Sequence, residues 1–159
     1  EPFRTQVTVV RRSATPLPGA ALTVTADRLA EVLPDADVVV VAAAMTGDTA
    51  HLIGAAELAA MKQTAILVNV ARGGLVDTDA LTAALASASI AGAGLDVTEP
   101  EPLPDGHPLW SEHRAIITSH SADTPEMTTP LLAERVKTNV RAFLDHSRFE
   151  GLVDPEAGY

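Results

Sequence analysis

Three side chains of the sequence, Arg72, Glu101 and His120, are of the types that bind a carboxylate and move a proton. Histidine gives and takes protons near neutral pH, so His120 is a candidate general acid or base. If Glu101 lies within hydrogen-bonding distance, its carboxylate favours the protonated imidazole and orients it. The guanidinium of Arg72 can hold a carboxylate through two parallel hydrogen bonds. The three residues predict acid–base chemistry on a small anion; the simpler alternative is that each is an ordinary solvated or structural side chain.

Asp96 belongs to a segment that could touch a ligand, because it ends a predicted strand, and open parallel sheets bind ligands at the carboxyl ends of their strands. The segment Gly92–Val97 half-matches the glycine fingerprint of dinucleotide folds. However, Val97 stands at the final glycine position, and a Glu-Pro repeat follows where a helix should begin. We therefore interpret the segment as a buried strand whose Asp96 either accepts hydrogen bonds from a ligand amide or caps a turn.

Arg11, Arg12 and Ser13 follow the first predicted strand, and no acidic residue stands beside them. In dinucleotide folds an acidic residue at this position binds the ribose 2′-hydroxyl, whereas arginine accommodates a 2′-phosphate. The pattern therefore favours NADP over NAD if the fold binds a dinucleotide. The alternative is a solvated turn.

Short apolar runs alternate with helical patterns along the chain, and these elements must position the candidate residues. The predicted strands are Val7–Val10, Val38–Val41, Ala65–Val70, Ile90–Val97 and Ala115–Thr118. The predicted helices cover residues 26–33, 55–61 and 77–87, the last of which is capped by Asp77. A final helix begins at Asp123 or Thr124 and carries Leu132, Val136, Val140 and Phe143 on one apolar face. The alternation predicts an α/β fold, a parallel sheet with helices on both faces, in which Val38–Val41 is buried on both sides.

Composition excludes several classes of function. The net charge is −10, which disfavours nucleic acid as a partner. The chain has no cysteine, so disulfides and thiolate metal sites are excluded, and we expect no metal. Neither a membrane-spanning apolar run nor a secretory signal is present, which favours a cytoplasmic protein without a membrane partner.

The motifs occur in an order that strongly resembles the D-isomer-specific 2-hydroxyacid dehydrogenases. The resemblance rests on Asn69–Asp77, Gly94–Pro104, His107–Trp110 and Thr118–His120, together with Ala44–Thr49, Leu152–Asp154 and Gly158-Tyr159. It covers nearly the whole chain. It implies a Rossmann-like parallel sheet and an NAD(P)-dependent oxidoreductase that transfers a hydride between nicotinamide and a D-2-hydroxyacid or 2-oxoacid. The implied partners are this small substrate and a second copy in a homodimer.

The resemblance also implies roles for individual residues. His120 would be the acid/base, Glu101 the carboxylate that orients it, and Arg72 the group that holds the substrate carboxylate. Asp96 would contact the nicotinamide carboxamide. The further cofactor-binding residues would be Arg11, Arg12, Ser13, Thr46 and Ala71. The cofactor would be NADP or NAD, with NADP favoured.

The sequence departs from the family pattern in two respects. Ser119 and Ser121 flank His120 where the family usually has proline and an apolar residue. The family's substrate-binding segment, first strand and glycine loop would also precede this sequence, because Glu1-Pro2-Phe3 resembles the end of the helix after that loop. We therefore expect a nucleotide-binding domain over residues 1–146 that lacks the first strand and glycine loop, and a tail over 147–159 that packs on a substrate domain. Alone, this chain should not complete a turnover.

Two alternative functions are compatible with the same residues. The chain could be a non-catalytic nicotinamide-binding or dimerisation module. It could also come from a related Rossmann enzyme such as an amino-acid or formate dehydrogenase, although formate dehydrogenases have glutamine at the position of Glu101.

Overall fold

The computed structural model describes residues 4–155, so that Glu1-Pro2-Phe3 and Gly158-Tyr159, on which part of the resemblance rests, lie outside the described residues. The strands are β1 (Thr8–Val10), β2 (Leu22–Val24), β3 (Val38–Val41), β4 (Ile66–Asn69), β5 (Gly92–Leu95) and β6 (Ala115–Ile117). The α-helices are α1 (Leu29–Val32), α2 (Ala55–Ala60), α3 (Thr78–Ala86) and α4 (Pro125–Leu144). Short 3₁₀ turns cover Ala26–Arg28, Leu33–Asp35, Gly47–Thr49, Gly73–Leu75 and Pro108–Trp110.

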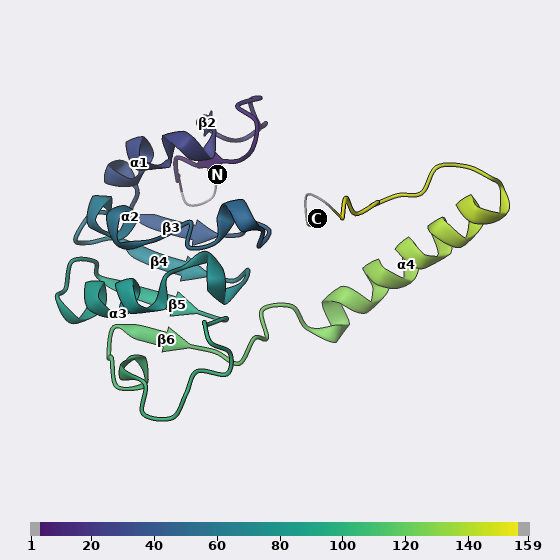
Figure 1. Cartoon of the computed structure of the whole chain (residues 1–159). Coiled ribbons are helices and arrows are strands. Elements are labelled where there is room, and N and C mark those ends of the chain that lie inside the picture. Colours follow the sequence, from purple (N-terminus) through teal and green to yellow (C-terminus); the bar gives the residue numbers. More distant parts are fainter. Residues whose placement is uncertain (1–3, 156–159) are drawn as a thin grey trace.

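All strand pairs in the described part of the chain are parallel (Figure 1). β3, β4, β5 and β6 form one sheet in that order, and β1 pairs with β2 in a second, smaller sheet. Successive parallel strands need crossover connections, which α2 and α3 provide. The Rossmann-like α/β prediction is confirmed.

The helices that connect the strands cover one face of the larger sheet. α2 contacts both α1 and α3, and their apolar residues pack with Leu67, Ala93 and Leu95 in one buried cluster. The alternate residues of the same strands point to the opposite face, where Val38, Val40 and Ile116 are 55%, 59% and 71% exposed. The prediction that Val38–Val41 is buried on both sides is therefore wrong for the described chain, because no described helix covers the second face.

Two further predictions of local structure need correction. β2 was not predicted, because a Leu-Thr-Val run of three residues carries little signal of its own and is stabilised by pairing with β1. The helix expected over residues 26–33 is divided into a 3₁₀ turn, the four-residue α1 and a second 3₁₀ turn that contains Pro34. In contrast, Asp77 caps α3 as predicted, and its side chain accepts a hydrogen bond from Ala80 N at 3.0 Å.

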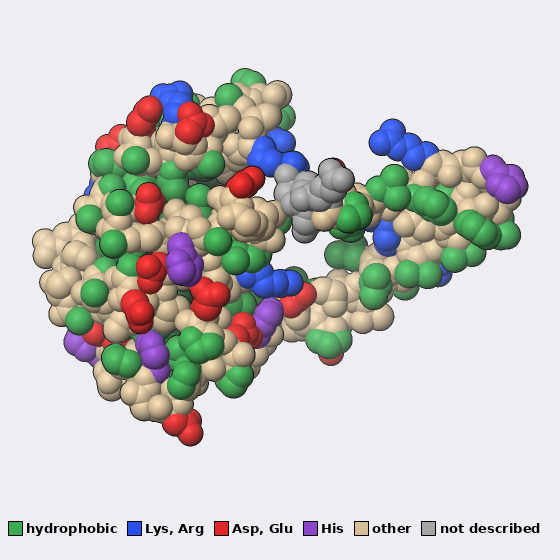
Figure 2. Space-filling view, viewed as in Figure 1, with side chains coloured by type: hydrophobic (Ala, Val, Ile, Leu, Met, Phe, Trp, Pro, Cys, Tyr) green, Lys and Arg blue, Asp and Glu red, His purple; other side chains and the backbone are tan. Residues whose placement is uncertain are grey.

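Helix α4 projects away from the sheets (Figure 1). Thr124 is its N-cap, but no side-chain capping bond forms. The predicted apolar face is mostly exposed, with Val140 at 53% and Phe143 at 68%, and hydrophobic side chains lie along the helix in Figure 2. No helix within residues 4–155 is long and apolar enough to span a bilayer.

Candidate active site

The carboxyl ends of β3 to β6 share one edge of the sheet, because the four strands are parallel and adjacent. Arg72 follows β4, Asp96 directly follows β5, and His120 comes shortly after β6. Glu101 lies in the long loop that leaves β5. The fold therefore places four of the predicted residues in loops at this edge.

The structure brings His120 and Glu101 into contact. His120 Nδ1 lies 2.7 Å from Glu101 Oε1, and both side chains are about 40% exposed. The contact occupies one ring nitrogen and leaves Nε2 as the nitrogen that can face a ligand. His120 has a φ of 56°, a left-handed conformation that is uncommon for a residue with a Cβ. Something must therefore hold this backbone in place.

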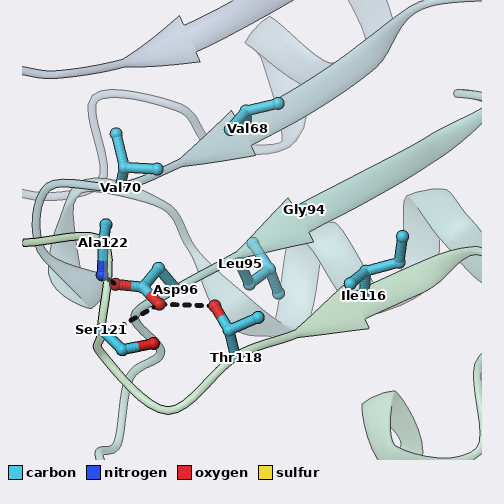
Figure 3. Close-up of a pocket in the computed structure, with 9 residues that line it drawn as sticks. All are labelled: Val68, Val70, Gly94, Leu95, Asp96, Ile116, Thr118, Ser121 and Ala122. Atoms are coloured by element: carbon cyan, nitrogen blue, oxygen red, sulfur yellow. Dashed lines mark hydrogen bonds between the residues drawn. The ribbon is translucent and has the colours of Figure 1, made fainter.

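Asp96 holds the segment that carries His120 (Figure 3). Its carboxylate accepts hydrogen bonds from Thr118 Oγ1 at 2.5 Å, Ser121 N at 2.9 Å and Ala122 N at 2.8 Å. These donors lie on both sides of His120 and fix the turn around it. A carboxylate has about four acceptor positions, so roughly one stays available for a ligand amide. Two roles were predicted for Asp96. The structure contains the first, in which Asp96 caps a turn; the second, a contact with the nicotinamide amide, stays a prediction.

The same contacts affect the ionisation of Asp96. The hydrogen bond from Thr118, followed by that from Ser121, lowers the pKa of the Asp96 carboxyl below its ordinary value of 3.8. A lowered pKa in the folded state means that the charged form stabilises the fold above pH 3.8. That contribution is lost as the pH falls through the folded value.

We expect Asp96→Asn to unfold at a lower denaturant concentration than the unchanged protein at pH 7, because an amide nitrogen cannot accept from Ala122 N. The difference should shrink below about pH 3.8, where the carboxyl is protonated in the unfolded chain. Urea titrations at several pH values measure this. Asp105→Asn, at an exposed loop position, is the control and should leave the unfolding midpoint unchanged. A difference that is constant with pH would contradict the prediction.

Arg72 lies on a turn that a buried asparagine shapes. Asn69 Nδ2 donates to the Arg72 carbonyl at 2.9 Å, and Asn69 Oδ1 accepts from Ala71 N at 3.1 Å. The Arg72 side chain is exposed, and its Nη1 donates to the Ala71 carbonyl at 2.7 Å. The following glycine is buried against the β5 loop, since a Cβ at Gly73 would lie 1.9 Å from the carbonyl oxygen of Thr98. The Arg72 turn and the loop that carries Glu101 are thus in backbone contact.

Residues 1–122 match the sequence profile of the D-isomer specific 2-hydroxyacid dehydrogenase NAD binding domain. The chain belongs to this dehydrogenase family.

Relatives in the family support this assignment. The chain is 42% identical over all 159 residues to an uncharacterised protein of Corynebacterium melassecola, of which it covers 52%. It is 43% identical over 115 residues to a glyoxylate reductase of Korarchaeum cryptofilum, with 72% of this chain and 35% of the relative covered. The chain therefore spans between about a third and a half of these relatives.

Solved structures of the family have the same fold. A D-isomer specific 2-hydroxyacid dehydrogenase of Xanthobacter autotrophicus, in complex with NADPH and MES, matches with a TM-score of 0.85 at 36% identity, over 97% of this chain and 63% of the other. An NADPH-dependent glyoxylate/hydroxypyruvate reductase of Sinorhizobium meliloti, in complex with NADP and sulfate, matches with a TM-score of 0.89 at 27% identity, over 99% and 51%.

The residues predicted to bind cofactor fit the polar parts of a nicotinamide dinucleotide, the cofactor class of this dehydrogenase domain. Arg11, Arg12 and Ser13 are exposed after β1 and offer cationic and hydroxyl groups to a ribose or phosphate. Thr46 is half-buried after β3, where its amide donates to Thr49 Oγ1 at 2.8 Å. Ala71 is half-buried in the Arg72 turn. These residues are positioned as predicted relative to the strand ends; their contacts with a cofactor stay predictions.

A hollow of about 350 Å³ adjoins the candidate site (Figure 3). Asp96, Thr118, Ser121 and Ala122 form its polar end at the sheet edge. The rest of its lining is apolar. Val68, Val70, Gly94 and Ile116 come from the uncovered sheet face, and Leu95, which belongs to the buried cluster, completes the lining. Only the polar end therefore belongs to the candidate site.

Sequence reasoning missed three residues that shape the candidate site. Asn69 and Thr118 form the hydrogen bonds described above, and His51 contacts the β5 loop. The sequence carried one weak indication for Asn69: it ends a strand predicted to be buried, and a buried side-chain amide needs hydrogen-bond partners. The Thr118–Asp96 contact joins the residues that directly follow two neighbouring strands, and sequence spacing gave no indication of it.

Proposed function

We propose that this chain is the nucleotide-binding part of an NAD(P)-dependent oxidoreductase that interconverts a small 2-oxoacid and a D-2-hydroxyacid. The observation that carries the proposal is the 2.7 Å contact between His120 and Glu101 at the carboxyl edge of the sheet. A histidine paired with a carboxylate at this edge is suited to donate a proton to a carbonyl oxygen. The membership of the chain in the dehydrogenase family supports the same chemistry.

Each residue has a distinct task in the proposed reduction. His120 Nε2 donates the proton to the carbonyl oxygen, while Glu101 keeps the ring oriented through Nδ1. Arg72 binds the substrate carboxylate and fixes the carbonyl near the imidazole, which lowers the entropy cost of reaction. A nicotinamide cofactor, when bound, would supply the hydride.

Steady-state kinetics of the full-length protein test the proposal. We expect NADPH oxidation with glyoxylate or hydroxypyruvate, the substrate class named in relatives of this chain. The 159-residue chain alone should give no detectable oxidation, because no strand within residues 4–155 leads through a Gly-x-Gly-x-x-Gly loop into a helix, the arrangement that cradles a diphosphate. A protein that binds the cofactor with negligible turnover would instead be a non-catalytic module. Robust activity of the 159-residue chain alone would contradict the expectation that it cannot oxidise NADPH by itself.

We propose NADP as the preferred cofactor, supported by Arg11 and Arg12 and by the lack of an acidic residue beside them. The double substitution Arg11→Ala with Arg12→Ala should raise the Kd for NADPH by about 10- to 100-fold, because charge-assisted hydrogen bonds to a phosphate are lost. The Kd for NADH should change less than about threefold, since its ribose has no 2′-phosphate. Fluorescence titration with both cofactors measures this.

Lys62→Ala is the control for that experiment, because this cation pairs with Asp37 just before β3 and so lies at the edge of the larger sheet opposite the candidate site. It should leave both affinities unchanged. Equal affinities of the double variant and the unchanged protein for NADPH would rule out a phosphate pocket at these arginines.

The remaining parts of the chain fit the same proposal. We propose that residues 147–159 pack on a substrate domain and that the protein forms a homodimer. The exposed apolar side chains of α4, such as Phe143, and of the open sheet face support further packing, because large apolar patches commonly mark interfaces. We place the enzyme in the cytoplasm, where nicotinamide cofactors are held. Light scattering of the full-length protein tests the dimer.

A further inference from the structure

A second histidine–carboxylate pair lies at the same edge of the sheet. His51 Nε2 is 3.0 Å from Glu99 Oε2, and the two side chains are 54% and 47% exposed. His51 belongs to the loop after β3, and Glu99 to the loop after β5. The pair therefore joins two loops that flank the loop after β4, which carries Arg72.

The turn after β4 is held between these two residues. His51 N donates to the carbonyl of Gly74 at 2.8 Å. A Cβ at Gly74 would lie 3.0 Å from Glu99 Oε1, so one carboxylate oxygen lies over this glycine while the other contacts the imidazole. His51 thus contacts the β4 turn through its backbone and the β5 loop through its ring.

The backbone of His51 supports a specific role for its side chain. Its φ is 50°, in the left-handed region that favours glycine or asparagine. A residue with a longer side chain there costs about 1 kcal/mol or more in backbone strain. The contact of the imidazole with Glu99 is what the structure gains from histidine at this position.

We propose that His51 and Glu99 are positioning residues that set the placement of Arg72 relative to the Glu101–His120 pair. Arg72 lies two residues before Gly74, and Glu101 lies two residues after Glu99. Fixing Gly74 against Glu99 therefore fixes the segment that binds the substrate carboxylate against the segment that orients the general acid. The expected kinetic effect rests on the proposed oxidoreductase function. The clamp, by which we mean the contacts of His51 and Glu99 with each other and with Gly74, can be tested without that function.

A metal site does not explain the pair. Within residues 4–155, no group of three or more histidine, aspartate or glutamate side chains is arranged to hold a metal ion. The neighbouring groups have other partners: Asp77 caps α3, and His107 Nδ1 accepts from Leu109 N. Nor does stability explain it, because half-exposed ion pairs contribute only about 0–1 kcal/mol.

The test uses His51→Ala, Glu99→Ala and their combination in the full-length protein. We expect kcat/KM for the 2-oxoacid to fall by about 10- to 100-fold, because small misplacements of a binding group have effects of this size. Most of the loss should appear in KM for the oxoacid, while the Kd for NADPH changes less than about twofold. The double variant should be no worse than either single one, since each removes the same contact. Glu99→Gln, which can still accept a hydrogen bond from Nε2, should recover part of the activity.

His113→Ala is the matched control. His113 Nδ1 lies 3.4 Å from Glu112 Oε1, but this pair of an exposed histidine and a half-buried glutamate precedes β6 and so lies at the opposite edge of the sheet. It should leave the kinetics unchanged. Kinetic constants of His51→Ala within twofold of the unchanged protein, or an equal loss of oxoacid and NADPH binding, would overturn the proposal.

Hydrogen exchange separates a failure of this inference from a failure of the proposed function. Even in a protein without turnover, His51→Ala should speed amide exchange in residues 72–76 and 98–103, whereas His113→Ala should not. Unchanged exchange in both segments would overturn the clamp whatever the activity of the protein.

Discussion

Replacing His120 with glutamine in the full-length protein should lower kcat by about 10²- to 10⁴-fold, the usual contribution of a general acid. Glutamine is polar and of similar reach, but it cannot be protonated and so cannot give a proton to a developing alkoxide. Glu101 fixes Nδ1 at 2.7 Å, and the hydrogen bonds of Asp96 fix the backbone around the ring. The loss should therefore be chemical rather than a result of local unfolding. Steady-state and single-turnover kinetics measure it.

Three comparisons make the His120 result interpretable. The Kd for NADPH should change little in His120→Gln, because the imidazole acts on the substrate carbonyl. The same substitution at the exposed His113 should leave kcat unchanged. Glu101→Gln should have a smaller effect than His120→Gln, since it weakens the orienting contact by removing its charge and retains the acid. A kcat of His120→Gln within about threefold of the unchanged protein would remove His120 from the mechanism, because even a modest general acid contributes more than this.

The meeting of His120 and Glu101 could be predicted because it depends on topology. Both residues leave neighbouring strands, β5 and β6, at the carboxyl edge of a parallel sheet, and that arrangement follows from alternating strand and helix patterns. The cap of α3 by Asp77 could be predicted for a similar reason, since capping is a local property. Local and topological rules therefore gave the scaffold and the central pair.

What the sequence could not indicate depends on contacts between distant segments. The run Val38–Val41 predicts a buried strand, but an apolar run does not show which segment covers it, and Val40 is 59% exposed in this chain. Likewise, the sequence around Asp96 does not show that its carboxylate accepts hydrogen bonds from Thr118 and from two backbone amides. The His51–Glu99 pair spans 48 positions and belongs to two irregular loops, for which no periodic pattern exists.

Replacing Gly73 with alanine should destabilise the fold by about 3 kcal/mol or more, at the upper end of single substitutions. Gly73 is buried, and a Cβ there would lie 1.9 Å from the Thr98 carbonyl oxygen, 2.2 Å from its carbon and 2.8 Å from Glu99 N. All three are backbone atoms, so no side-chain rotation can relieve the overlap. The turn that carries Arg72 and the loop that carries Glu101 would have to move apart. Chemical denaturation of the variant and the unchanged protein measures the loss.

Gly47→Ala is the control that separates this steric effect from the general effect of removing a glycine. Gly47 also lies in a 3₁₀ turn at the same sheet edge, but a Cβ there would meet no atom within 4 Å. Alanine at that position should leave stability unchanged or raise it by about 0.4–1 kcal/mol, because it restricts the unfolded chain. Where Gly73→Ala does fold, its KM for the oxoacid should rise, since Arg72 is the adjacent residue. Equal denaturation midpoints for the two alanine variants would mean that the β4 turn and the β5 loop are not in backbone contact. The proposed geometry that joins Arg72 to the Glu101–His120 pair would then be wrong.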